Sequence, residues 1–377
     1  MGGGRLPLAP VVRCMRRRTI LGCVVERDDR AARDGDTRAG RRRFLKTAGL
    51  ASAGAILFGG ARQAGGEGGM AQEVPRRQFG RTGVQVSALG LGGYDIGKYG
   101  IEREAIRVVQ EAVDAGVTFL DNAWEYNEGK SEEWMGKALV GRRDTVFLMT
   151  KLCSHGRDKQ FSLRMLDESL RRLKTDHLDL WQIHEVVYED EPDRHFAKGG
   201  AVEALAEAKQ QGKVRFVGFT GHKDPAIHLK MLAHDFPFDA CQLPLNAFDA
   251  GFRSFERQVL PELNRRGIAA IGMKSMGGGG EPLKGGAVTP AEALRYAMSL
   301  PVATTVSGMP SLTVLQQNLE VARGFTPMSA AEMEALRGRV AAVAADGRFE
   351  LYKTSMKYDG DEGRQQHGFP PSGELGG

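Results

Sequence analysis

The run TFLDNAWEYNEGKSEEWMGKALV, residues 118–140, contains one complete strand, loop and helix unit. Residues 118–122 form a short, largely apolar run of the kind found in buried strands, and residues 131–140 repeat apolar side chains at helical spacing. A polar loop joins the two segments. A strand followed directly by a helix is the repeating unit of folds built on a parallel sheet.

The same alternation extends from residue 84 to residue 325. Strands are expected at 87–93, 118–122, 146–151, 178–184, 214–220, 240–243, 268–274 and 304–308. Helices are expected at 102–115, 131–140, 162–173, 200–211, 225–234, 255–266, 289–299 and 311–322. Gly116, Gly212 and Gly267 stand just past helix ends, where helix breakers belong. Eight such pairs in about 240 residues predict an α/β fold, the (β/α)8 TIM barrel.

Two competing nucleotide-binding folds lack their phosphate-binding loops. A doubly wound domain needs a glycine fingerprint, and the nearest candidate, Gly90-Leu91-Gly92, has Asp95 at the third glycine position. The chain also has no GxxxxGK[ST] loop. A further helix with a Ser329–Glu332 capping box is expected after the barrel. The polar tail from Asp346 on is expected to drape over the barrel and then fray.

Charge and cysteine content exclude other classes. Residues 1–71 contain 14 Lys and Arg against 6 Asp and Glu, whereas the rest of the chain contains 38 against 41. The pI of about 9.0 therefore belongs to the first fifth of the chain and does not indicate a nucleic-acid partner. Four cysteines without a CxxC pair exclude a disulfide scaffold and a zinc ribbon. Cys153 is interpreted as a packing or an oxidisable thiol, and Cys241 should face away from the barrel interior.

The basic segment has the pattern of an export signal. Arg41, Arg42, Arg43, Phe44, Leu45 and Lys46 precede fourteen weakly apolar residues, 47–60, which are too few for a stable membrane span. The paired Arg41 and Arg42 resemble a twin-arginine signal, with cleavage after Ala71. This predicts the twin-arginine export machinery as a partner and a periplasmic location. Two alternatives stay open: a leader that is never exported, which leaves the protein in the cytoplasm, and a true start at Met15.

Four reactive side chains follow three neighbouring strands. Asp121 ends the second strand, Lys151 the third and His184 the fourth, and Tyr126 lies in the loop after the second. The carboxyl ends of barrel strands form one face, so these groups should converge there. A nearby ammonium stabilises a phenolate and brings proton transfer from tyrosine within reach. Asp121 would aim Lys151, and His184 would orient a carbonyl oxygen. The pattern predicts a proton-donating site without a metal.

At these residues the chain resembles the aldo-keto reductase family, over about residues 75–325. The resemblance rests on GRTGVQVSALGLGG (80–93), FLDNAWEYNEGKSEEWMGKAL (119–139), TK (150–151), LDLWQIH (178–184), VRFVGFTGH (214–222), QLPLN (242–246) and VSGMPSLTVLQQNLEVA (306–322). It implies a nicotinamide-binding barrel, which together with the export pattern and the polar tail divides the chain into a leader at 1–71, the barrel at 72–345 and a tail at 346–377. It also implies reduction of a small-molecule carbonyl substrate, with Tyr126 as general acid, Lys151 and Asp121 tuning it and His184 positioning the substrate. The alternative is a cofactor-binding redox sensor with little turnover.

The resemblance also implies a cofactor site, with departures. Gln242 matches the residue that binds the nicotinamide amide. Thr220 replaces a serine, and Gly221 replaces the asparagine that usually follows it. Met273 replaces a stacking tyrosine, and Lys274 is either a phosphate ligand or a solvated side chain. NADPH is the expected cofactor, but Gly308 and Val314 stand where a Lys and an Arg often hold its 2′-phosphate, so NADH is an alternative. The remaining expected positions are Gly92, Gly93, Gln317 and Asn318 for the cofactor, and Trp124 and His222 for the substrate pocket.

Overall fold

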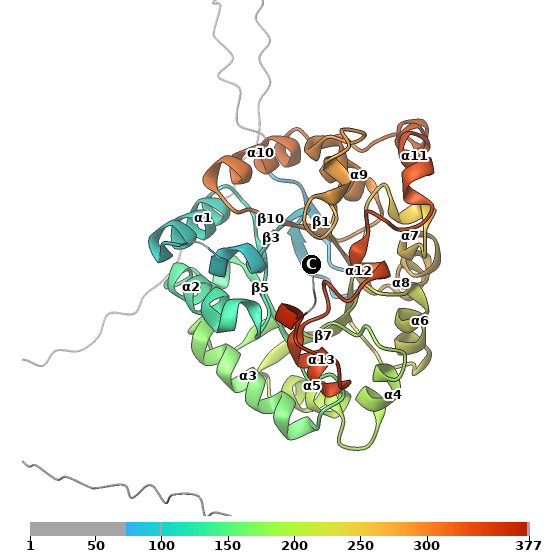
Figure 1. Cartoon of the computed structure of the whole chain (residues 1–377). Helices are drawn as coiled ribbons and strands as arrows, with labels where there is room; N and C mark the ends of the chain where they lie inside the picture. The colour runs from blue at the N-terminus through green and yellow to red at the C-terminus, as the bar shows by residue number, and fades with distance from the viewer. Residues whose placement is uncertain (1–72, 99, 375–377) are drawn as a thin grey trace, which may run out of the picture. The chain divides into compact units, whose positions relative to one another are not determined.

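The computed structural model describes residues 73–98 and 100–374. The predicted leader, with Arg41, Arg42 and the cleavage position after Ala71, lies outside these residues. Eight parallel strands close into a barrel in the order β10-β3-β4-β5-β6-β7-β8-β9 (Figure 1). The predicted TIM barrel is therefore confirmed. The strands are β3 (Leu89–Gly92), β4 (Phe119–Asp121), β5 (Phe147–Leu152), β6 (Leu178–Ile183), β7 (Val214–Thr220), β8 (Ala240–Pro244), β9 (Ala269–Met273) and β10 (Thr304–Gly308).

Helices surround the barrel close to their predicted positions (Figure 1). They are α1 (Glu102–Asp114), α2 (Lys130–Ala138), α3 (Lys159–Leu173), α5 (Ala201–Gln210), α6 (Pro225–Ala233), α7 (Phe255–Gln258), α8 (Leu260–Arg266), α9 (Pro290–Ser299) and α10 (Leu312–Arg323). The helix predicted at 255–266 is split into two at Val259. Pro261 explains the break, because its ring has no N–H and clashes with the carbonyl four residues earlier.

A hairpin and a short helix before the tail were not predicted from the sequence. The antiparallel strands β1 (Arg76–Gln78) and β2 (Gln85–Ser87) form a hairpin before the barrel. Phe79, which follows β1, is fully buried and packs 4.7 Å from Phe147, measured between ring centroids. These two rings belong to a separate apolar cluster with side chains from β4, β5, β6, β8, β9 and β10. The second element is the short helix α4 (Glu191–Phe196) after β6.

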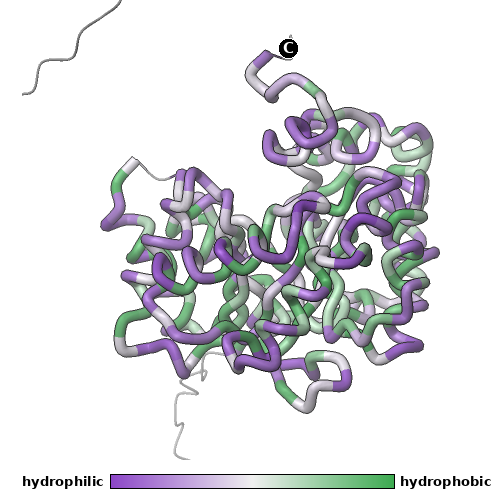
Figure 2. Tube along the Cα trace, turned by 90° about the horizontal axis from the view of Figure 1, so that it is seen from below, coloured by the Kyte–Doolittle hydropathy of each residue, from purple (hydrophilic) through white to green (hydrophobic). Residues whose placement is uncertain are grey.

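Each strand has two different faces. In every strand but β3 and β10, one face contributes to the cluster around Phe79 or packs against it, and the other packs in the main core, which includes Leu120, Trp181 and Cys241. Because side chains alternate along a strand, Cys241 and its neighbour Gln242 point in opposite directions. The prediction that Cys241 faces away from the interior is thus confirmed. Figure 2 shows hydrophobic stretches concentrated toward the middle of the folded part and hydrophilic stretches toward its outside.

The C-terminal region is folded against the barrel. α11 (Ala330–Ala344) begins at the predicted capping box, in which the Ser329 and Glu332 side chains bond to each other's backbone N–H. α12 (Leu351–Thr354) and α13 (Asp361–Gln366) follow and lie at one end of the barrel (Figures 1 and 2). The expectation that the tail frays is wrong for residues 346–374. The ammonium of Lys353, for example, is fully buried 2.7 Å from Asp249.

Candidate active site

The four predicted catalytic side chains meet at the carboxyl ends of the strands. Lys151 Nζ pairs with Asp121 Oδ1, donates to the carbonyl of Asn122 at 2.7 Å and lies 3.4 Å from Tyr126 Oη. Tyr126 begins a short 3-10 turn, Tyr126–Gly129, in which Asn127, Glu128 and Gly129 all have positive φ. This turn directs the chain from β4 into α2 and leaves the Tyr126 hydroxyl beside Lys151.

A chain of buried polar groups fixes Asp121 and Lys151. Gln242 Nε2 donates to Asp121 Oδ2 at 2.6 Å, and Gln182 Nε2 donates to Gln242 Oε1 at 3.0 Å. Buried charges need this kind of pairing, because an isolated charge in a protein interior is costly. One amide hydrogen of Gln242, predicted to bind a nicotinamide, is therefore committed to Asp121. Its cofactor role stays a prediction.

The proton on Tyr126 is held more tightly than the sequence suggested. Burial raises the pKa of Tyr126 well above its usual value, and the carboxylate of Asp121 adds to the effect. Lys151 was expected to favour the phenolate, but its charge is largely compensated by Asp121 at closer range. The phenol is consequently protonated at neutral pH, which is the form that a proton donor requires.

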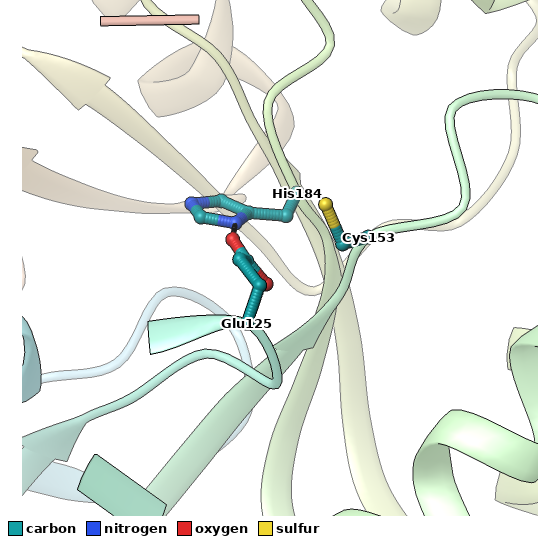
Figure 3. Close-up of side chains that lie close together, drawn as sticks. All are labelled: Glu125, Cys153 and His184. Carbon is teal, nitrogen blue, oxygen red and sulfur yellow. Dashed lines mark hydrogen bonds and ion pairs between the residues drawn. The ribbon is translucent and has the colours of Figure 1, made fainter. Parts of the chain in front are cut away.

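His184 stands beside Tyr126 as a neutral imidazole. The two ring centroids lie 5.5 Å apart with the rings nearly perpendicular. Burial lowers the pKa of His184 well below its usual value, with Lys151 adding to the shift. The carboxyl group of Glu125, whose pKa burial raises to about 7, contacts His184 Nδ1, while Nε2 lies on the opposite side of the ring (Figure 3). Glu125 was not predicted; its position between Trp124 and Tyr126 was the only signal in the sequence.

The predicted cofactor residues are distributed along the same end of the barrel. Thr220 ends β7, Gln242 lies in β8, Met273 ends β9, and Gly308 ends β10 beside Gly92. Asn318, in α10, donates to Ser307 Oγ at 3.1 Å, whereas Gln317 is exposed on the same helix. Gly93 is required for packing, since a Cβ there would come within 2.3 Å of the Asp121 carbonyl. The donor set of hydroxyl and amide groups fits a nicotinamide and its ribose.

The tail contacts Lys274, the residue predicted to meet a cofactor phosphate, and the nearby Gly278. Lys274 Nζ lies 5.4 Å from the ring centroids of both Tyr352 and Tyr358, and burial lowers its pKa. This cation–π position differs from that of a fully solvated side chain, and the role of Lys274 as a phosphate ligand stays a prediction. Tyr358 Oη donates to Glu281 at 2.7 Å, and a Cβ on Gly278 would come within 2.3 Å of the Tyr358 ring.

The two predicted pocket residues have other neighbours. His222 is buried against the tail, 3.7 Å from Asp359 and edge-on to the ring of Tyr352. The indole of Trp124 contacts α3, where its Nε1 donates to Glu168 at 2.7 Å. The structure therefore brings the four predicted catalytic residues together and places Trp124 and His222 against packed elements. Their role in substrate binding stays a prediction.

Known proteins share both the sequence pattern and the fold. A family model described as the aldo/keto reductase family matches residues 88–284. The aldo-keto reductase YhdN of Bacillus subtilis is 33% identical over 195 residues, which cover 48% of this chain and 55% of that protein. The L-galactose dehydrogenase of Arabidopsis thaliana is 33% identical over 160 residues, which cover 40% and 49%. The chain thus spans about half the length of these two relatives.

Solved structures agree on the fold. An aldo/keto reductase from Klebsiella pneumoniae in complex with NADP and acetate has a TM-score of 0.60 at 22% identity, covering 70% of this chain and 95% of that one. The aldo-keto reductase AKR11C1 from Bacillus halodurans, in its holo form, has a TM-score of 0.60 at 24% identity, with coverage of 71% and 96%. At this level of identity, the likeness shows the barrel and its connectivity.

Proposed function

The chain belongs to the aldo/keto reductase family, and from this premise we propose that it reduces an aldehyde or ketone to an alcohol, with Tyr126 as the proton donor and a reduced nicotinamide as the cofactor. The observation that carries the proposal is the 3.4 Å approach of Lys151 Nζ to Tyr126 Oη, with Lys151 anchored on Asp121. The oxidoreductase class follows from the family, whereas the cofactor, the acid and the carbonyl substrate are proposals.

Each side chain at this site has its own role in proton transfer. Tyr126 donates its Oη proton to the carbonyl oxygen of the substrate as that oxygen gains negative charge. The ammonium of Lys151 then lies beside the new phenolate and stabilises it. Asp121 and Gln242 keep Lys151 in place. The neutral His184 offers its Nε2–H to the same carbonyl oxygen when the protonated carboxyl group of Glu125, whose pKa burial raises to about 7, donates to Nδ1.

A nicotinamide cofactor would be held by groups at the ends of β7 to β10. The hydroxyl of Thr220, the second amide hydrogen of Gln242, the thioether of Met273 and the exposed backbone at Gly308 are suited to contact it, together with Asn318. When bound, the reduced cofactor supplies a hydride to the carbonyl carbon. NADPH is the proposed form, supported by the NADP complex of the Klebsiella pneumoniae protein. NADH stays an alternative, because Gly308 and Val314 offer no cation to a 2′-phosphate.

We further propose that residues 1–71 direct the folded protein to the twin-arginine export machinery and are removed after Ala71, leaving the barrel (72–345) and the tail (346–377) in the periplasm. No helix among residues 73–374 has the length and apolarity needed to cross a membrane. Replacing Arg41 and Arg42 with lysine should retain the protein in the cytoplasm at its full length. Export of this variant at the wild-type level would contradict the proposal.

The reductase proposal is tested with the full-length protein. NADPH and NADH are titrated by the fluorescence of the reduced ring, and oxidation is followed with a panel of aldehydes. Tyr126→Phe should bind the cofactor as wild type does and lose turnover by about 10²–10⁴-fold. Failure to bind either cofactor contradicts the redox function, and turnover by Tyr126→Phe at the wild-type rate contradicts the role of Tyr126. Tight binding without turnover of any carbonyl compound favours the redox sensor.

A further inference from the structure

His184 belongs to a cluster of side chains that offer nitrogen, sulfur and oxygen donors. Glu125, Cys153 and His184 each place one donor atom within 4.8 Å of the other two (Figure 3). They come from the loop after β4, the end of β5 and the end of β6. Cys153 and His184 are buried, and Glu125 is partly exposed. Proton donation by Tyr126 makes no use of Cys153.

His155 extends the cluster on the far side of the thiol. Its Nε2 lies 3.2 Å from Cys153 Sγ, and its Nδ1 lies 2.7 Å from Glu191 Oε1; all three residues are fully buried. The second Glu191 oxygen accepts from the backbone N–H of Val187 and Tyr188. Glu191 is thus fixed in place and presents His155 Nε2 to the thiol. A carboxylate that holds one imidazole nitrogen while the other faces outward is typical of metal-binding histidines.

We propose that Glu125, Cys153, His155 and His184 bind a divalent transition-metal ion such as Zn²⁺. Two imidazole nitrogens, one thiolate and one carboxylate are the ligand types that zinc takes, and four of them complete its preferred tetrahedral shell. Ca²⁺ and Mg²⁺ prefer shells of oxygen alone, so the nitrogen and sulfur donors argue against them.

The spacing of the donors is compatible with this ion. Bonds of about 2.0 Å to nitrogen and about 2.3 Å to sulfur at a tetrahedral angle separate the two atoms by about 3.5 Å. The distance from Cys153 Sγ to His155 Nε2, 3.2 Å, is close to this value. The donor atoms of Glu125, Cys153 and His184 lie within 4.8 Å of one another, so side-chain movements of about 1 Å bring them to one ion. Glu125 Oε2 is buried without a hydrogen-bond partner among the described residues, so it is available as a ligand.

The proposed metal site is partly exposed on the side of Glu125 and covered by the tail on the side of His155. The Glu125 side chain is 20% exposed and gives an ion a path from the barrel mouth. On the opposite side, α13 of the tail covers His155. Gly363 is needed there, because a Cβ at this position would come within 2.6 Å of the His155 ring. Gln366 donates to the His155 carbonyl, so the tail is fastened directly over the cluster.

Metal binding would act on the proposed active site through His184. An ion on Nδ1 leaves the proton on Nε2, the nitrogen on the opposite side of the ring. The ion would therefore favour the same tautomer of His184 as the hydrogen bond from Glu125 does, with the proton on Nε2, and would hold it more firmly. It need not touch the substrate. The metal site can exist whether or not the protein reduces carbonyl compounds, and its test does not depend on activity.

The first experiment measures metal content directly. The full-length chain is stripped with a chelator, reloaded with Zn²⁺ or Co²⁺, desalted and analysed by mass spectrometry of the metals. We expect one ion per chain, and for Co²⁺ a near-ultraviolet thiolate-to-metal absorption band. Cys153→Ala should lose both signals. Cys241→Ala is the matched control, since Cys241 is equally buried but lies in the outer core away from these donors; it should keep both.

Two further variants separate metal binding from a folding defect. His155→Gln removes the fourth ligand without touching the thiol and should also lose the ion. Glu191→Gln should weaken affinity by about 10–100-fold while keeping the cobalt–thiolate band. Circular dichroism confirms that each variant is folded. The proposal is overturned if the reloaded wild-type chain holds no stoichiometric metal, if the cobalt form lacks the thiolate band, or if folded Cys153→Ala or His155→Gln keeps the ion.

Discussion

Gln242 donates a 2.6 Å hydrogen bond to Asp121 across the end of the barrel, from β8 to β4. The two strands are not neighbours in the barrel, so the contact is made through its interior. It leaves Asp121 with its two oxygens committed, one to Gln242 and one to Lys151. The Lys151 ammonium beside Tyr126 is therefore held by two strands with different predicted roles. Asp121 on β4 was predicted to be catalytic, and Gln242 on β8 was predicted to bind the cofactor.

The Asp121–Lys151 pair should show opposite effects on stability and on activity. Lys151→Met leaves Asp121 as an unpaired buried charge and should lower the free energy of unfolding by about 3–5 kcal/mol. Adding Asp121→Asn removes that charge and should restore most of the stability. Carbonyl reduction should stay lost in the double variant, because Tyr126 then has no ammonium beside it. Urea unfolding and single-turnover kinetics measure the two effects. If the double variant is as unstable as Lys151→Met, the pair is not the cause of the loss.

The tail should be displaced by a single methyl group. Gly278→Ala places a Cβ 2.3 Å from the Tyr358 ring, so Tyr358 must move and its contact with Lys274 should weaken. Hydrogen exchange of the backbone amides at 346–374 should accelerate. Gly285→Ala is the control, because a Cβ there meets nothing within 4 Å and its φ is not positive. Equal exchange rates in the two variants would show that the tail does not depend on this contact.

Acid should destabilise the fold through buried histidines. Burial lowers the pKa of His222 to about 4 and that of His228 to about 3. An unfolded chain takes up these protons near pH 6.5, so between pH 6.5 and 4 only the unfolded state is protonated at these residues. Stability should therefore fall with decreasing pH in this window, by about 1.4 kcal/mol per pH unit for each histidine. Above pH 6.5 the two residues contribute no pH dependence.

The slope of that pH dependence can be tested with one substitution. His228→Gln removes one of the two groups, so the free energy of unfolding of this variant should fall less steeply than that of the wild type between pH 6.5 and 4. Urea unfolding at several pH values gives both slopes. Parallel curves for the two proteins would mean that His228 is not held neutral in the fold.

The hairpin before the barrel should contribute strongly to stability. Phe79 is fully buried against Phe119, Phe147 and Phe216. Phe79→Ala should lower the free energy of unfolding by about 3–5 kcal/mol, the usual cost of removing a buried aromatic side chain. Val140→Ala is the comparison, because Val140 is 68% exposed and its truncation should cost about 0.5 kcal/mol or less. Similar losses from both substitutions would argue against an anchoring role for Phe79.

The sequence by itself determined the barrel and placed the proposed catalytic residues at one end of it. Apolar runs alternate with amphipathic segments at local spacings that need no tertiary information, and all eight strands lie where this alternation predicted them. Asp121, Lys151 and His184 could be assigned to one face because the ends of parallel strands always meet at one edge. Tyr126 could be assigned to the same face because it lies in the loop directly after the second strand. The helix break at Val259 was missed, although Pro261 marks it in the sequence.

Only the tertiary structure decided which groups surround the proposed catalytic residues. Glu125, Cys153, His155 and His184 come together from three loops without any metal-binding motif in the sequence, because the register of neighbouring strands, not their spacing along the chain, aligns their ends. The tail reaches Lys274 and His155 from about 80 and 210 residues away. The pKa of Tyr126 is raised by burial and, further, by acidic side chains from several loops, Asp121 first. Such combined effects are properties of packed side chains, and no local pattern in the sequence encodes them.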